Sequence, residues 1–122
     1  MKVLSTIMVL IVAALHGWFL VVEMFLYEHP IGLKIFSHTP EHAAETAMFA
    51  ANQGLYNGFL VAGLLWGLLR GKRDFTIFFL LFVIIAGVYA GIVVDPGVFY
   101  LQAAPAALGL VLTLLAPKPR SA

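Results

Sequence analysis

The sequence predicts an all-α protein: a four-helix transmembrane bundle that residues 1–122 form as one integral membrane domain. The first observation is composition, because 62% of the residues are hydrophobic and 11% are charged, with a mean hydropathy of +1.01. A soluble domain carries about 25% charged residues. The second observation is length, since a bilayer core about 30 Å thick needs roughly 20 apolar residues per helical span, which leaves room for four spans. The third is the distribution of basic residues along the chain.

Composition also excludes several classes of function. The net charge is +1, and no basic run with interleaved aromatic residues suggests a nucleic-acid partner. The chain has no cysteine, which excludes disulfides, thiolate metal sites and thiol catalysis. The expected partner is the lipid bilayer.

The first span is expected at about residues 3–27. This apolar stretch is too long for the core of a signal peptide, and no A-x-A-like cleavage site follows it, so we interpret it as a retained span. The segment 28–40 is too short to cross a membrane and mixes apolar with polar residues. We expect it to form an interfacial or partly re-entrant loop.

The second span is expected at about residues 40–69. Thr39 is a suitable N-cap, and Pro40 suits the first helical position because its missing N–H has no partner there in any case. Gly71 is a suitable residue for the C-terminal cap.

The third and fourth spans are expected at about residues 75–94 and 98–116. Asp74 is expected as the N-cap of the third span, and a turn is expected at residues 95–97. Pro105 lies inside the fourth span and is expected to kink it.

The basic residues predict the orientation. All but one of the seven lysines and arginines lie at the N-terminus, between the second and third spans, or at the C-terminus: Lys2, Arg70, Lys72, Arg73, Lys118 and Arg120. Only Lys34 lies on the other side. Because basic residues concentrate in cytoplasmic loops, both termini are expected in the cytoplasm of a multi-pass protein of the inner cell membrane.

Every histidine and glutamate lies between positions 16 and 45. His16 and Glu23 fall inside the first span, seven residues apart and therefore on one helix face. Ionisable groups within a membrane are costly and usually face a polar interior, which makes these two residues functional candidates. We expect Glu23 to be the proton-active group and His16 to assist it, as the catalytic candidates.

The second span carries a polar stripe. Five residues on and beside it are expected to line a binding site for a small apolar or lipid-like molecule: Glu45, Asn52, Gln53, Tyr56 and Asn57. The structural alternative is that they form hydrogen bonds between helices. Nearly opposite lies a ladder of small residues that lets another helix approach closely: Ala50, Gly54, Gly58 and Ala62.

Three chemistries fit this set. The first is acid–base conversion of the bound molecule by a desolvated carboxyl and imidazole. The second is proton-coupled transport of a small molecule by a homodimer. The third is metal binding, for which His42 and Glu45 lie on adjacent turns and Glu23 would approach from the first span, although no paired Glu-x-x-His units are present. No cofactor is expected.

The string ANQGLYNGFL at residues 51–60 is specific as a signature. Glu23 lies in the first span, and Glu28 and His29 lie in the loop after that span, before this string. With these residues the chain resembles, over essentially its whole length, the small bacterial membrane family catalogued as domain of unknown function 1304. This resemblance implies a four-span membrane protein without an assigned reaction and supplies no catalytic residues. In size the chain is also similar to small multidrug transporters, which are four-span dimers with one membrane glutamate in the first span.

Overall fold

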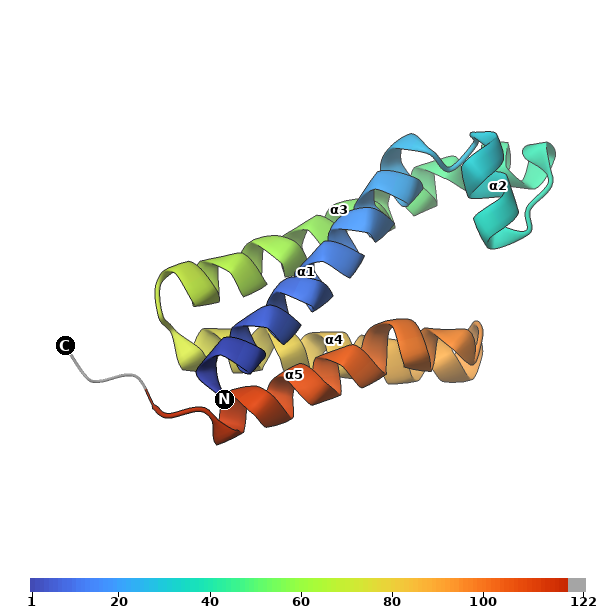
Figure 1. The fold of residues 1–122 in the computed structure, drawn as a ribbon. Coiled ribbons are helices and arrows are strands. Elements are labelled where there is room, and N and C mark those ends of the chain that lie inside the picture. Colours follow the sequence, from blue (N-terminus) through green and yellow to red (C-terminus); the bar gives the residue numbers. More distant parts are fainter. Residues whose placement is uncertain (119–122) are drawn as a thin grey trace. The chain divides into compact units, whose positions relative to one another are not determined.

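The computed structural model describes residues 1–118, and over this range the chain is helical throughout, without strands (Figure 1). The elements are α1 (Lys2–Phe25), α2 (Pro30–Phe36), α3 (Pro40–Leu69), α4 (Arg73–Val93), the π-helical segment η1 (Phe99–Ala103) and α5 (Ala104–Leu115). Two of them, α1 and α4, are long and apolar enough to cross a membrane. The prediction of an all-α chain is therefore confirmed.

Both ends of α3 follow from local chemistry that the sequence displays. The Thr39 hydroxyl accepts a hydrogen bond from the backbone N–H of His42 at 3.2 Å, as an N-cap does. At the other end Gly71 has a φ of 61°, and the next N–H, of Lys72, bonds to the carbonyl of Gly67 at 2.9 Å. A left-handed residue at this position closes the helix, and glycine adopts that conformation without strain.

Helix α4 begins at Arg73, two residues earlier than expected, so the prediction of Asp74 as its N-cap is wrong. The capping position is Lys72, and Asp74 lies in the first turn, where its carboxylate accepts a hydrogen bond from the N–H of Phe75 at 2.9 Å. A negative charge still interacts favourably there with the positive end of the helix dipole.

The connection between α1 and α3 is more ordered than a loop because α2 lies within it. The His29 ring accepts a hydrogen bond from the N–H of Ile31 at 3.2 Å, and Pro30 occupies the first turn, so this short helix has its own N-terminal cap. It ends at Ser37, whose φ is 55°.

Pro105 changes the helix that precedes it. Because Pro105 has no N–H, it cannot donate to the carbonyl one turn earlier, and the backbone widens into η1, where the N–H of Ala104 bonds to the carbonyl of Phe99. The turn before η1 is confirmed, since the Asp95 carboxylate accepts a hydrogen bond from the N–H of Gly97 at 2.7 Å.

The chain divides into two compact units. The terminal unit contains residues 1–15 and the described chain from residue 62 onward, and the central unit contains residues 16–61. Within the terminal unit glycines allow close packing, because a Cβ on Gly87 would lie 2.7 Å from the backbone nitrogen of Ala103 and one on Gly91 would lie 2.7 Å from the Phe99 ring. Such small residues let helices approach each other closely.

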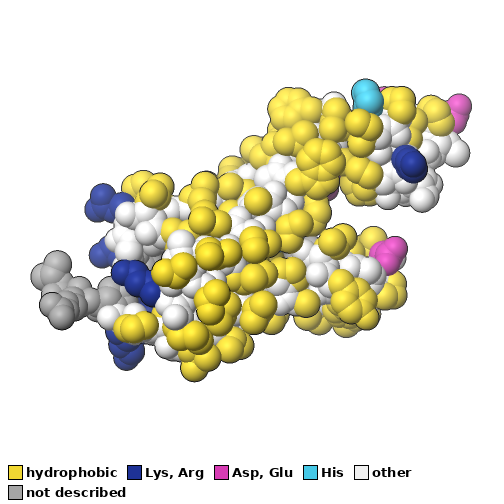
Figure 2. Space-filling model, viewed as in Figure 1, with side chains coloured by type: hydrophobic (Ala, Val, Ile, Leu, Met, Phe, Trp, Pro, Cys, Tyr) yellow, Lys and Arg dark blue, Asp and Glu magenta, His cyan; other side chains and the backbone are white. Residues whose placement is uncertain are grey.

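The terminal unit has charged ends and an apolar body. Its basic residues belong to the N-terminus, the α3–α4 connection and the end of α5, where Arg73 also donates a hydrogen bond to the carbonyl of Leu114 at 2.8 Å. Figure 2 shows these dark-blue side chains together at one end, whereas Arg120 lies outside the described residues. Large apolar side chains cover the middle and are exposed, including Ile85 at 66%. Polar residues such as Ser5 and Thr76 are buried.

Candidate functional site

The central unit joins Glu23 of α1 to Asn57 of α3. The Asn57 Nδ2 donates a hydrogen bond of 2.5 Å to the Glu23 Oε1. Asn57 is 7% exposed and Glu23 is half-buried. A carboxyl and an amide thus pair within a mostly apolar seam between two helices.

Gly54 makes this pairing geometrically possible. A Cβ at this position would lie 2.6 Å from the Met24 Cγ, 3.1 Å from the Glu23 Cβ and 3.3 Å from the Leu20 carbonyl oxygen. Only a residue without a side chain therefore lets α1 come this close to α3. Since Asn57 follows Gly54 by three residues, it lies on the same side of α3 and reaches the Glu23 carboxyl.

The other polar candidates on α3 are exposed, unlike Asn57. Glu45, Asn52, Gln53 and Tyr56 are all exposed, with Tyr56 at 55%. The sequence placed Asn57 with this stripe, but the structure places it beside Gly54 on the packed side. Asn57 is therefore the member of the set that lies on the packed side with the small residues, whereas Asn52 and Tyr56 face away from it.

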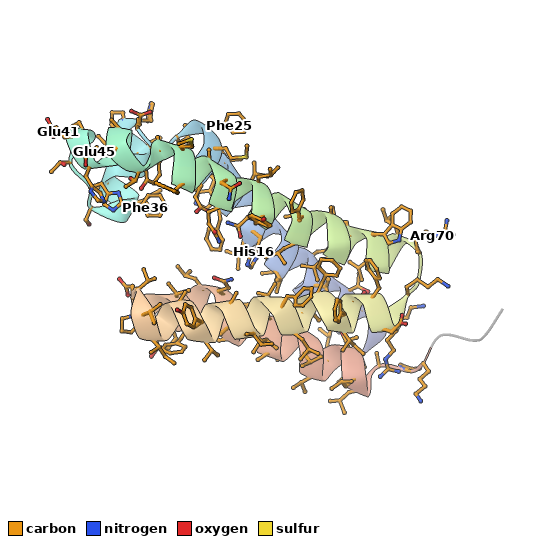
Figure 3. All side chains as sticks on the ribbon, turned by 180° about the vertical axis from the view of Figure 1, so that it is seen from behind. His16, Phe25, Phe36, Glu41, Glu45 and Arg70 are labelled. Carbon is orange, nitrogen blue, oxygen red and sulfur yellow. The ribbon has the colours of Figure 1, made fainter. Side chains whose placement is uncertain are left out.

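Glu45 is remote from the Glu23–Asn57 pair along α3. Twelve residues of helix separate it from Asn57, which corresponds to about 18 Å. In Figure 3 Glu45 is drawn beside Glu41 in the first turns of α3. A small molecule held at Glu23 would therefore not reach both carboxylates.

His16 is completely buried. Its ring meets Phe19 edge to face, with the centroids 5.2 Å apart. His16 and Glu23 share a face of α1, but seven residues separate them by about 10 Å along the helix axis. The imidazole and the carboxyl thus leave α1 two turns apart.

A second polar cluster lies where α1 ends and α3 begins. We call it the tyrosine–histidine cluster, and it consists of Tyr27, Phe36, His38, His42 and Thr46. The Tyr27 hydroxyl is 2.8 Å from the Thr46 Oγ1 and 3.2 Å from the His38 Nδ1. The rings of His38 and His42 are perpendicular, with centroids 4.5 Å apart, and the Phe36 ring stacks on His38.

Of the residues in this cluster, only His42 was a candidate site residue from the sequence. The available signal was spacing for His42 and Thr46 only, which lie four residues apart on one side of α3. His38 precedes the helix, so helical spacing does not place it. Tyr27 carries no comparable signal. Its role follows only from the return of the chain through α2.

Among its described residues the structure brings together no metal site of three or more ligands. Within residues 1–118 there is no group of three or more His, Asp or Glu side chains placed to hold a metal ion. The metal candidates His42 and Glu45 are therefore not joined there by Glu23.

Comparisons with known proteins give a family and no assigned activity. A family model with the description "Protein of unknown function (DUF1304)" matches residues 10–114. No curated protein and no solved structure matches the chain.

Proposed function

We propose that this chain, which belongs to the family of proteins of unknown function (DUF1304), is a four-span inner-membrane protein that binds a small apolar or lipid-like molecule at Glu23 and Asn57. The observation that carries the binding site is the Glu23–Asn57 hydrogen bond. A carboxyl placed among apolar side chains is costly unless it is used, so its presence within an apolar helix favours a functional role.

The four-span arrangement uses α1, α3, α4 and the continuous helix from η1 through α5. Helices α1 and α4 supply two apolar spans, and Phe99–Leu115 is a shorter apolar helix. Helix α3 has 30 residues and is about 45 Å long, which exceeds a hydrocarbon core of about 30 Å. Its polar first turns, with Glu41 and His42, would then lie outside the core.

The surface of the terminal unit supports this arrangement. Exposed residues such as Ile85 and Ile92 would face lipid, because an apolar surface of this extent is unfavourable in water. The basic end of the unit would lie in the cytoplasm according to the positive-inside rule. Both termini would then be cytoplasmic, and α2 would lie on the outer side.

The chemistry of the pair defines the kind of ligand. Among the described residues Glu23 makes its hydrogen bond through Oε1 only, which leaves Oε2 to accept a bond from a hydroxyl or amide of a ligand. Leu20 and Met24 flank the carboxyl on α1 and offer apolar contact. Gln53, one turn before Asn57 and exposed, can bind a second polar atom. The ligand is therefore an apolar molecule with a small polar head group.

Acid–base conversion of this molecule would use the same oxygen. A general base must lie within hydrogen-bond reach of the proton that it removes, and a head group at Oε2 satisfies this condition. Binding is the simpler function, and conversion would follow from it.

Mass spectrometry of the purified full chain tests the proposal. The protein is extracted from its native membrane in mild detergent, and the retained small molecules are identified for the wild type, Glu23→Leu and Glu45→Gln. A hydrogen bond to a charged group is worth about 1.5–3 kcal/mol, so Glu23→Leu is expected to lower retention by about tenfold or more. Glu45→Gln, a change of a distant exposed acid, is expected to leave retention unchanged.

Two results would overturn the binding site. One is a wild-type protein that retains no small molecule, and the other is a folded Glu23→Leu protein that retains as much as the wild type. A proton-coupled flux in liposomes that Glu23→Gln abolishes would support the dimeric transporter instead.

A further inference from the structure

The hydrogen bonds of the tyrosine–histidine cluster have only one possible direction. The Thr46 hydroxyl donates its single proton to the carbonyl of His42 at 2.8 Å. Its oxygen must then accept the 2.8 Å bond from the Tyr27 hydroxyl. Since Tyr27 has thus used its own proton, its oxygen accepts the 3.2 Å bond from the Nδ1–H of His38.

This order of protons determines the tautomer of His38. A neutral imidazole carries one N–H, and in His38 that N–H is on Nδ1. The lone pair of Nε2 is therefore available for a ligand. In metal sites a histidine typically donates one ring N–H to a neighbouring oxygen and binds the metal through the other nitrogen, and Tyr27 provides such an oxygen.

His42 provides a second imidazole at the right distance. The two ring centroids are 4.5 Å apart. Two imidazoles on one tetrahedral zinc, with Zn–N bonds of 2.0–2.1 Å, have centroids about 5 Å apart. His42 is exposed and has no side-chain hydrogen bond within residues 1–118, so its ring can turn toward the His38 Nε2.

We therefore propose that His38 and His42 bind a late first-row divalent metal ion, Zn²⁺ or Cu²⁺, at the start of α3. Imidazole nitrogens suit these ions, and water would complete the coordination. Coordination by two histidines and water agrees with the lack of a third acidic or histidine ligand among the described residues. The site is separate from Glu23 and does not depend on the function proposed for Glu23.

Metal titration of the full chain, purified without a polyhistidine tag, tests the site. Zn²⁺ binding is measured by calorimetry, and Cu²⁺ binding by electron paramagnetic resonance, which resolves coupling to imidazole nitrogens. We expect one ion per chain and coupling to two nitrogens. His38→Ala and His42→Ala should each weaken binding by about tenfold or more, and Tyr27→Phe by about tenfold, because loss of an outer-shell partner costs about 10–100-fold in metal affinity.

Three controls make the result specific. His29→Asn changes the loop histidine outside the pair, keeps a side chain that can cap α2, and should leave affinity unchanged. Glu23→Leu should also bind metal as the wild type does. Circular dichroism verifies that each variant is folded, and His42→Ala removes an exposed ring without disturbing the Tyr27 hydrogen bonds.

Three outcomes would overturn the proposal. They are the absence of stoichiometric binding, wild-type affinity in both His38→Ala and His42→Ala, and a copper spectrum without imidazole coupling. Wild-type affinity in Tyr27→Phe would overturn the role of the hydrogen-bond chain.

Discussion

Asn57 donates a hydrogen bond of 2.5 Å to Glu23, and this bond connects α3 to α1 across 34 positions of sequence. It is formed where Gly54 lets the two helices approach each other, and it gives the Glu23 carboxyl a donor in an otherwise apolar seam. We therefore expect the stability of the central unit to depend on this contact, and the ligand binding proposed above would use the same carboxyl.

Loss of the Asn57 amide should destabilise the protein. Asn57→Leu is expected to lower the free energy of unfolding by about 1–3 kcal/mol, because the Glu23 carboxyl would lose its donor. Unfolding in mixed micelles measures this change. Gln53→Leu, on an exposed side chain of the same helix, should change it by no more than about 0.5 kcal/mol. In a double-mutant cycle Glu23→Leu and Asn57→Leu should couple by about 0.5–3 kcal/mol, and strictly additive effects would contradict the pairing.

Two glycines of the central unit should respond oppositely to alanine. Gly54→Ala is expected to cost about 1–3 kcal/mol of stability, because its Cβ would collide with Met24 and the Leu20 carbonyl. A Cβ on Gly17 meets nothing within 4 Å. Gly17→Ala should therefore stabilise α1 by about 0.5–1 kcal/mol. Thermal unfolding compares the two variants, and a tolerated Gly54→Ala would argue against the tight approach of α1.

The bond between Ser5 and Thr113 predicts an order of stabilities in the terminal unit. Thr113 donates its proton to the carbonyl of Gly109 at 2.7 Å, so Ser5 must donate the 2.8 Å bond between the two hydroxyls. Ser5→Ala leaves Thr113 with its bond and should cost about 1 kcal/mol. Thr113→Val leaves the Ser5 hydroxyl buried without an acceptor and should cost about 1–3 kcal/mol. Chemical unfolding of the two variants gives the order, and a more damaging Ser5→Ala would reverse the assignment of the donor.

The membrane orientation can be tested with single cysteines, because the chain has none of its own. In intact cells an impermeant thiol reagent should label Glu28→Cys and Pro96→Cys from outside. It should label Lys72→Cys only after permeabilisation, because basic loops remain in the cytoplasm. The opposite pattern would place the termini outside, and external labelling at all three positions would contradict the four-span arrangement.

The sequence predicted helix ends and turns correctly where a capping or turn residue determines them. Thr39 and Gly71 mark the two ends of α3, and Asp95 organises its own turn. The sequence did not predict α2, because a helix of seven residues has too few positions to show periodicity. It did not predict the π-helical turn either. The position of Pro105 shows which backbone hydrogen bond is missing, but the sequence does not show whether the preceding backbone kinks or widens in response.

The sequence predicted the two residues of the candidate site but not the hydrogen bond between them. Glu23 and Asn57 were both named from the sequence, but Asn57 was grouped with the exposed Asn52 and Tyr56. Periodicity gives the angle between two residues on a helix, whereas the rotation of the helix toward its neighbour depends on packing. Here Gly54 packs against α1 and turns Asn57 inward.

The sequence by itself determined the helical character of the chain, the apolar composition of its helices and the position of its charges, because these depend on residue type and local order. Only the tertiary structure decided that Glu23 meets Asn57, and that Tyr27 orients His38 beside His42. A hydrogen bond requires its atoms to lie about 3 Å apart, and that distance between remote residues is set by how closely the helices pack.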